Sequence, residues 1–404
     1  MATQFIQIEE IRRAPPADRL ALWDLGFRPF YQLAGLQAVV SVPLWAAQFL
    51  GLLPHPVLAG PLWHAHEMVF GFALAVVIGF LFTAGRHWSG QPTPTGRPLM
   101  ALAALWVAAR VLMWSPWPWA AAVANVAVPL AAAWGLGRAL HRGPHRRNHF
   151  FVLLLLGLAV AAASLHASAL GAGAVTATLA VPLALDVLLF MIAVMGGRVI
   201  PMFSQNGVPG LRATRHPPLE RLALGSLLGL GAADALQALV PTPHWAPLQA
   251  LMLGLALATH GLRLVLWQGW KSGRQPLVWV LHLAYAWLCV HLALRLGAWA
   301  GLVTPGLAVH ALTVGTLGTM TLGMMTRTAL GHTGRALRAG ALETTAYLLI
   351  TLAALLRVAL PLAAPGWLPL AVGASSVAWA LAFGLFLVRY APWLWRPRAD
   401  GQPG

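Results

Sequence analysis

Two histidines and a glutamate stand at the start of a long apolar stretch. The segment PLWHAHEMVFGFALAVVIGF, residues 61–80, carries His64, His66 and Glu67 near its beginning. His310 stands near the start of a second apolar stretch. Neutral imidazole is the commonest metal ligand among side chains, and a neighbouring carboxylate fixes its tautomer and orientation. We therefore interpret the three histidines as candidate ligands of a metal or haem iron, and Glu67 and His310 as candidate catalytic groups.

The spacing within HAHE limits what these residues can do together. On a regular helix His64 and His66 point about 200° apart, so we expect either a distorted first turn or separate partners. Glu67 lies close enough to His64 to accept a hydrogen bond from its second ring nitrogen. The alternative is that Glu67 only stabilises the helix N-terminus through the helix dipole. Order and spacing differ from the zinc-protease motif HExxH, so that chemistry is excluded.

The composition indicates an integral membrane protein. Of the 404 residues, 59% are hydrophobic and 9% are charged, against about 25% charged residues in soluble domains. The net charge of +16 comes mainly from short arginine clusters between apolar runs. Membrane topology explains such clusters, so we expect no nucleic-acid binding. The single cysteine, Cys289, excludes an internal disulfide and a cysteine-based metal site.

Twelve membrane spans are expected, because about 20 apolar residues cross a bilayer as a helix. They lie near 30–53, 64–84, 98–114, 118–140, 150–171, 175–197, 220–240, 245–267, 277–300, 305–326, 341–361 and 366–390. With the N-terminus in the cytoplasm, all but three of the 26 lysines and arginines fall on the inner side, as the positive-inside rule requires. The exceptions, Arg110, Arg295 and Arg357, lie in outer halves of spans.

We therefore predict an all-α polytopic membrane bundle of about twelve helices with both termini cytoplasmic. Its parts are a cytoplasmic segment 1–28, one transmembrane domain 29–390 and a cytoplasmic tail 391–404. The start of the chain has no apolar segment before its first charges, so we expect no cleavable signal peptide.

Topology also sorts the polar residues by depth. Ionisable groups at membrane depth usually face the bundle interior and mark a buried pair or a site. The outer level holds the candidates already named together with His166 and His291, and the inner level holds His282, His260, His87 and His332. Taken singly, His166, His260 and His291 are interpreted as hydrogen-bonding core residues. Asp186, near mid-membrane, either pairs with Arg110 or belongs to a proton path, and Asp234 is a further buried carboxylate.

The tenth span carries two patterns with open interpretations. Gly315, Thr319 and Gly323 form a small-residue stripe that admits a second helix or a flat cofactor. Met320 and Met324, one turn apart, are either core residues or thioether ligands of copper(I).

Four arginines gather at the inner level near His332. They are Arg28, Arg198, Arg327 and Arg335. They are either positive-inside anchors or a clamp for haem propionates or an acidic substrate. The pair Gly196–Gly197 and Pro201 around Arg198 predict an irregular helix end there.

Five motifs in order along the chain resemble those of the NnrS family of bacterial membrane proteins. They are FRPFYQLAG (27–35), WHAHEMVFGFA (63–73), GGRVIPMFSQNG (196–207), LHLAYAW (281–287) and HALTVGTLGTMTLGMMTRTALGHTGR (310–335). The resemblance covers about residues 22 to 390. It implies a twelve-span protein that binds haem b and copper and lessens nitric oxide stress. The matching ligand-type residues are His64, His66, His282, His310 and His332, with Arg28, Arg198, Arg327 and Arg335. AGRHWSG departs from the pattern, which weakens His87 as a ligand.

Three functions are compared. The first is a haem protein, with copper, in the bacterial inner membrane that binds nitric oxide and either reduces it or protects iron from it. In this interpretation His282 and His332 ligate a second haem, and Glu67, Asp186 and Asp234 carry protons. The second is a secondary transporter for a metal ion, haem or small anion, weakened because no repeat relates the two halves. The third is an assembly partner in a respiratory complex. The residues do not identify an electron donor.

Overall fold

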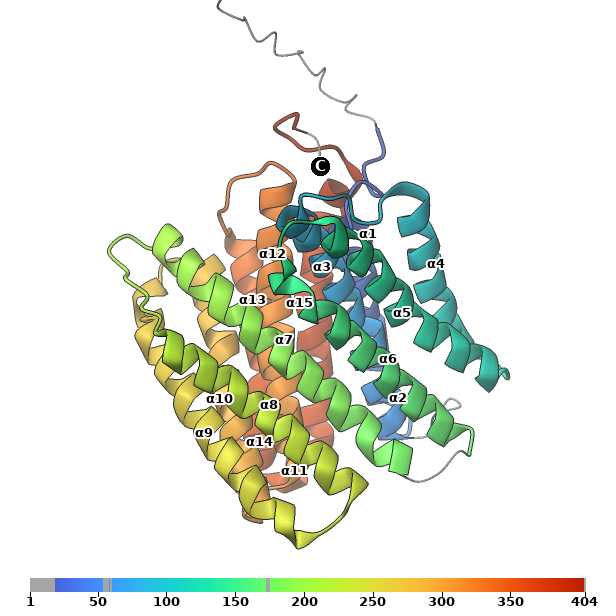
Figure 1. Ribbon diagram of the computed structural model, residues 1–404, viewed down its shortest axis with the longest axis vertical. Coiled ribbons are helices and arrows are strands. Elements are labelled where there is room, and N and C mark those ends of the chain that lie inside the picture. Colours follow the sequence, from blue (N-terminus) through green and yellow to red (C-terminus); the bar gives the residue numbers. More distant parts are fainter. Residues whose placement is uncertain (1–18, 54–57, 59, 172–174, 403–404) are drawn as a thin grey trace, which may run out of the picture.

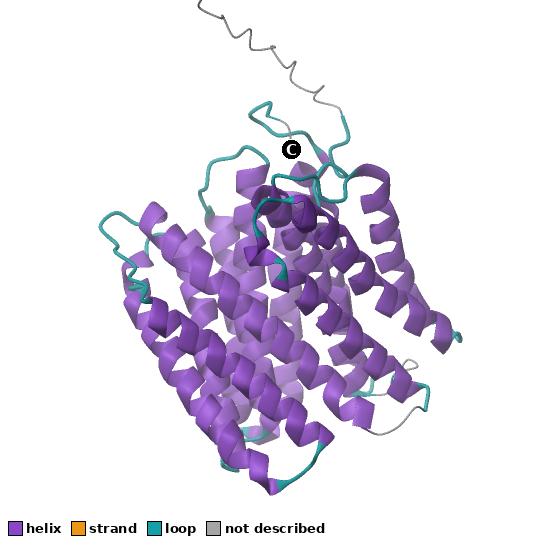
Figure 2. Cartoon of the chain, viewed as in Figure 1, coloured by secondary structure: helices purple, strands orange, loops and turns teal. Residues whose placement is uncertain are grey.

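The computed structural model describes residues 19–53, 58, 60–171 and 175–402, and these ranges contain helices and loops without any strand (Figure 2). The helices form twelve rods at the places expected from hydropathy. Eleven of them are long and apolar enough to cross a bilayer by themselves. The twelfth, α4, has 17 residues and is about 25 Å long. The expected polytopic bundle is confirmed.

The rods run in chain order as follows. They are α1 (Phe27–Phe49), α2–η1–α3 (Pro61–Ser89), α4 (Gly96–Leu112), α5 (Pro118–Arg142), α6 (Phe150–Ala169), α7 (Val175–Gly207), α8 (Pro217–Leu239), α9 (Ala246–Leu266), α10 (Pro276–Trp299), α11–η5–α12 (Pro305–His332), α13–η6–α14 (Ala341–Ala363) and α15 (Leu368–Trp395). Short 3₁₀ turns stand in several of the connections.

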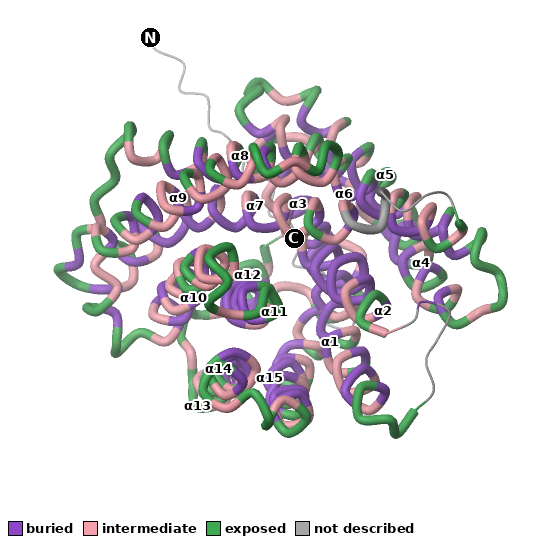
Figure 3. The backbone as a smooth tube through the Cα atoms, turned by 90° about the horizontal axis from the view of Figure 1, so that it is seen from below, coloured by how far each residue is buried: buried purple, intermediate pink, exposed green. Residues whose placement is uncertain are grey.

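The rods follow one another around the bundle in chain order (Figure 1), and we divide them into three consecutive groups of four. Within each group, consecutive rods contact one another: α1 to α5, α6 to α9, and α10 to α15. Contacts of α5 with α6, α9 with α10, and α15 with α1 close the ring. Seen along the bundle, α3, α7 and α12 lie toward the middle (Figure 3). The second rod of each group therefore supplies the interior of the bundle.

Large apolar side chains cover the outside of the bundle. Val123, Leu153 and Val388 are each about two-thirds or more exposed. An apolar outer surface of this kind is solvated by lipid chains. The protein is a multi-pass membrane protein in a lipid environment.

The described ends of the chain meet at one end of the bundle. The backbone N–H of Ala21 donates to the carbonyl of Trp395 at 2.8 Å. The buried Arg28 guanidinium donates to the carbonyls of Leu394 and Arg396 at 3.0 and 2.8 Å. α1 therefore begins where α15 ends, as an even number of spans requires.

The second and tenth rods repeat the same construction. Identical residues recur 244 positions apart: Pro61 and Pro305, His66 and His310, Gly71 and Gly315, Gly79 and Gly323, Gly90 and Gly334. Each rod starts with a six-residue helix, α2 (Pro61–His66) or α11 (Pro305–His310), that begins with proline and ends with histidine. Proline suits that first position because it has no N–H to leave unpaired.

Each of these short helices continues into a π-helical segment before regular α-helix resumes. The segments are η1 (Glu67–Ala73) and η5 (Ala311–Gly318), followed by α3 (Leu74–Ser89) and α12 (Thr319–His332). π-helical turns are rare and are frequent at functional sites. The π-helical segment begins after His66, so the turn that carries His64 and His66 is regular α-helix and the alternative of a distorted first turn is wrong.

The rods that precede the second and tenth rods, α1 and α10, also end alike. The N–H of Leu52 donates to Ala47 and that of Leu302 to Gly297, both at 2.8 Å. The repeat thus relates the first and last groups of four, not two halves of six.

The expected irregular helix end at Arg198 is wrong. α7 is one continuous helix through the GGRVIP motif. A methyl group on Gly196 would lie 3.0 Å from the ring of Tyr285, and one on Gly197 would clash with the Arg263 guanidinium. The glycine pair therefore serves close packing against α9 and α10.

Candidate functional site: an outer cavity and the polar network beside it

His66 and Glu67 lie in a buried polar network in the outer half of the bundle. The Nδ1 of His66 lies 2.9 Å from Oε1 of Glu67, and its Nε2 lies 3.1 Å from Nε2 of His166 on α6. Glu67 also accepts hydrogen bonds from Arg110 of α4 at 2.7 Å and from Gln37 of α1 at 2.6 Å. Three rods therefore meet at a carboxylate that is 2% exposed, and α6 joins them through His66.

The hydrogen bonds of His66 and Glu67 are complete without a ligand, while the buried Nε of Arg110 has no partner among the described residues. Because a carboxylate only accepts, His66 carries its proton on Nδ1 and presents a lone pair at Nε2. The Nε2–H of His166 donates to that lone pair. Arg110 gives Glu67 a counter-charge and donates to Asn125 as well. The network is neutral when both imidazoles are neutral.

The expected pairing of Glu67 with His64 is therefore wrong, and so is one of the two alternatives left open for Asp186. Glu67 orients His66 and not His64, and Arg110 pairs with Glu67 and not with Asp186. Asp186 instead shares Arg295 with Asp234. Arg110 reaches Glu67 because of how the rods pack side by side. Topology sets the depth of a residue in the membrane, but α4, not α7, is the rod that contacts η1.

His64 and His310 share a different environment, an outer cavity of about 180 Å³. We define the outer cavity by its lining from α1, α2, η1, α7, α11, η5, η6 and α15, which includes both histidines and Arg357. His64 therefore faces away from His66, as their spacing predicts.

Both imidazoles of the outer cavity keep nitrogen atoms without a protein partner. The Nδ1–H of His310 donates to the carbonyl of Gly306 at 2.7 Å, which leaves the Nε2 lone pair unused. His64 stacks on Trp45, with ring centroids 5.1 Å apart and an angle of 14° between planes. Its Nδ1 is buried and has no hydrogen-bond partner in the part of the chain that the structure describes.

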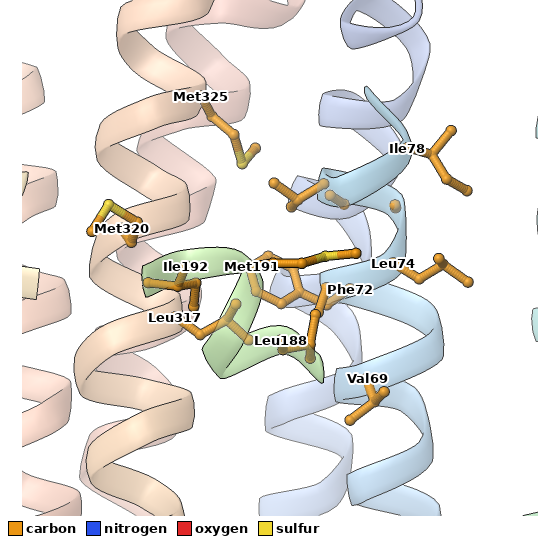
Figure 4. Packing of buried hydrophobic residues seen from close by; sticks show 14 of the residues in the cluster. Val69, Phe72, Leu74, Ile78, Leu188, Met191, Ile192, Leu317, Met320 and Met325 are labelled. Atoms are coloured by element: carbon orange, nitrogen blue, oxygen red, sulfur yellow. The ribbon is translucent and has the colours of Figure 1, made fainter. Parts of the chain in front are cut away.

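A second, apolar cavity of about 90 Å³ lies among α3, α7 and α12. Its lining from the repeated rods is in register: Ala73, Val76, Val77 and Phe80 correspond to Leu317, Met320, Thr321 and Met324, again 244 positions apart. From α7, side chains including Leu188, Met191 and Ile192 point between the two rods (Figure 4).

The apolar cavity lies about one helical turn inward from the outer cavity. Val69 and Val314 line the outer cavity, and Ala73 and Leu317 line the apolar one. Met320 and Met324 face this apolar space, where no histidine lines the wall, so the structure favours their interpretation as core residues. The stripe of Gly315 and Gly323 packs against Trp287 and Val280 of α10.

His282 and His332 have separate neighbours at the inner level. The Nε2 of His282 lies 2.8 Å from the hydroxyl of Ser204, and its ring packs directly over Gly269. Its Nδ1 has no hydrogen-bond partner among residues 19–53, 58, 60–171 and 175–402. The ring of His332 lies 5.6 Å from that of Phe27. The structure does not bring the two histidines to a common site.

The four inner arginines also have separate partners, which favours anchoring over a common clamp. Arg28 binds carbonyls at the end of α15, Arg198 donates to Asn148 at 2.7 Å, Arg327 lies 3.7 Å from the Phe203 ring, and Arg335 lies 4.1 Å from the Trp393 ring.

The other membrane histidines act as core residues. His260 contacts the hydroxyl of Tyr285 at 2.6 Å and the carbonyl of Ala223 at 3.0 Å. The Nδ1–H of His291 donates to the carbonyl of Ala308 at 2.8 Å, and its buried Nε2 has no hydrogen-bond partner among the described residues.

Sequence reasoning underrated two residues of the outer level. His166 is a hydrogen-bonding core residue, as expected, but its partner is the candidate ligand His66 itself. Arg357 was noted only as an exception to the charge rule. That exception was the sequence feature that pointed to a role for Arg357, because an arginine in the outer half of a span needs a nearby group that stabilises its charge.

A family model described as NnrS protein matches residues 21–398. The chain belongs to the NnrS family. Membership makes it a membrane protein of the nitric oxide response. The match spans every rod, including both repeated ones and the outer cavity between them. No curated protein matches the chain.

Proposed function

We propose that the protein binds a haem or copper group in the outer cavity through His64 and His310, and that nitric oxide binds there. One observation carries this proposal. Two imidazoles from rods far apart in sequence line one cavity, and each retains a ring nitrogen that no described protein group uses. Imidazole is a ligand for both haem iron and copper. The donor set therefore fits either group.

His310 is prepared for such a role by its own helix. Its Nδ1–H is held by the carbonyl of Gly306, which fixes the tautomer with the lone pair on Nε2 and makes that nitrogen more basic. Trp45 holds the ring plane of His64 by stacking. The bound metal would supply a coordination position for a diatomic ligand.

The apolar cavity supports a small uncharged ligand. It adjoins the outer cavity along the same three rods, and apolar cavities of this size take up small apolar molecules rather than ordered water. Nitric oxide is small and uncharged.

We propose binding as the main role, ahead of proton-coupled reduction. Glu67, Asp186 and Asp234 are the expected proton carriers, and each forms an ion pair with an arginine. In this arrangement each carboxylate neutralises an arginine, which is the role of a structural ion pair. The transporter alternative loses support because α7 has no broken segment at GGRVIP.

We also propose that the protein lies in the bacterial inner membrane with both termini in the cytoplasm. The arginine-rich loops lie at the end of the bundle where the described chain ends meet, and cytoplasmic loops carry the excess of arginine and lysine.

The test is to purify the full chain in mild detergent after haem-replete expression. Its optical spectrum and metal content are recorded, and nitric oxide is added to the reduced protein. We expect a Soret band or bound copper, and a spectral change with nitric oxide. Neither haem nor copper in the preparation would refute the proposal. His310→Ala and His64→Ala should lower the content of the bound group, and His145→Ala, in a loop, should not.

A further inference from the structure

Three arginines lie in outer halves of spans, and two of them are neutralised by carboxylates. Arg110 pairs with Glu67 at 2.7 Å, and Arg295 pairs with Asp186 at 3.3 Å and also with Asp234. A charge at membrane depth costs several kcal/mol unless it is paired or reaches water. These two arginines therefore follow the expected rule.

Arg357 is the exception. It lies in the π-helical segment η6 (Leu355–Ala359) of the eleventh rod, is partly buried and lines the outer cavity. In the described residues no carboxylate lies within ion-pair distance of its guanidinium, and no side chain or carbonyl accepts a hydrogen bond from it. The outer cavity thus contains a cation without its counter-charge.

The remaining polar groups of the outer cavity do not supply that charge. The hydroxyls of Ser375 and Ser376 donate to carbonyls of their own helix, at 3.1 and 2.7 Å. Thr313 does the same toward Val309 at 3.0 Å. Neutral imidazoles add no negative charge.

We propose that Arg357 binds an anionic oxygen group in the outer cavity, a carboxylate or a small oxyanion. A guanidinium matches the two oxygens of such a group with paired hydrogen bonds. The bound anion neutralises Arg357, as Glu67 neutralises Arg110 and Asp234 neutralises Arg295. This inference rests on the proposed function only in placing the anion beside the same histidines.

Two sources supply this chemistry. One is a carboxylate that belongs to a bound organic cofactor, such as a haem propionate. The other is a free oxyanion, for which nitrite is the probe. The cavity volume of about 180 Å³ accommodates a free anion of that size.

The experiment compares Arg357→Gln and Arg357→Lys with wild type and with Arg338→Gln, a loop arginine, as control. The full chain is purified in detergent, with and without haem-replete expression. Haem per chain is measured by absorbance, and sodium nitrite binding to haem-free protein by calorimetry at constant ionic strength.

A cofactor carboxylate predicts that Arg357→Gln lowers haem per chain by at least about tenfold, that Arg357→Lys lowers it less, and that nitrite does not bind. A free oxyanion predicts that nitrite binds wild type and that Arg357→Gln weakens this binding by at least about tenfold. Wild-type haem content in Arg357→Gln together with no nitrite binding to wild type would overturn the inference.

Stability gives a second readout that does not depend on a ligand being known. In ligand-free protein, removing an uncompensated charge should maintain or raise the unfolding temperature in Arg357→Gln, whereas Arg110→Gln should lower it because Glu67 loses its partner. A large loss in Arg357→Gln would show that a protein group already neutralises Arg357, against the inference. Failure of the proposed function is distinct: if haem-replete preparations contain neither haem nor copper but nitrite still binds through Arg357, only the proposed function is refuted.

Discussion

The rods α2–η1–α3 and α11–η5–α12 place a histidine at the same position and use it differently. Both begin with proline, reach a histidine after six residues and widen into a π-helical segment. His66 is fully buried with both nitrogens bonded, while His310 has one carbonyl partner and lines the outer cavity.

The group that faces Nε2 explains the difference. In both histidines an oxygen accepts from the Nδ1–H: Glu67 for His66, and the carbonyl of Gly306 for His310. At Nε2, however, His166 donates to His66, and no described residue is bonded to His310 there. The repeated rods thus set where an imidazole lies, and the neighbour at Nε2 decides whether that imidazole is structural or available to a ligand.

The largest effect is expected from Glu67→Ala. It leaves Arg110 as a buried charge without a partner and frees Nδ1 of His66, so the free energy of unfolding should fall by about 3–5 kcal/mol. Denaturant or thermal unfolding in detergent measures this fall. Asp400→Ala is the matched control: the Arg398 guanidinium lowers the pKa of the Asp400 carboxyl to about 2, yet that pair is exposed to solvent and contributes little. Equal losses in the two variants would contradict the network.

An intermediate effect on stability is expected at the equivalent glycines Gly71 and Gly315, which compare the packing of the two repeated rods. A methyl group on Gly315 would lie 2.5 Å from the rigid ring of Trp287, and one on Gly71 would lie 2.7 Å from the flexible end of Gln37. We expect Gly315→Ala to cost about 1–3 kcal/mol and Gly71→Ala less, as measured by unfolding in the same detergent. The reverse order would mean that the tenth rod packs more loosely than described.

The smallest expected effects on stability distinguish the role of His166 from that of His310. His166→Ala removes the partner of Nε2 in His66 and should cost about 1–3 kcal/mol. In ligand-free protein His310→Ala removes only one bond to its own helix and should cost about 1 kcal/mol or less. Unfolding temperatures of the two variants, purified without haem supplementation, check this order. A larger loss of stability in His310→Ala than in His166→Ala would show that His310 is the structural histidine.

Hydropathy and charge were sufficient to predict the rods, their order and the depth of the polar residues in the membrane. The π-helical segments were not predictable, since EMVFGFA and ALTVGTLG have the apolar composition of ordinary membrane helix. The pairing of Glu67 with His64 is wrong because these two residues of one rod face different surroundings. The pairing of Arg110 with Asp186 is wrong for another reason. Depth along the membrane follows from position in a span, whereas the neighbour across the bundle depends on how rods pack around the axis. Arg110 and Asp186 were assigned by depth, and packing gave each another partner.

The most direct test of the central claim is the amount of haem and copper bound by His310→Ala compared with His166→Ala, purified in parallel after haem-replete expression. Both histidines lie at the outer level, but only His310 lines the outer cavity. The account predicts that His310→Ala loses most of the bound group while His166→Ala, although less stable, retains it. Full retention in His310→Ala, or loss in His166→Ala alone, would contradict the assignment of the outer cavity as the binding site.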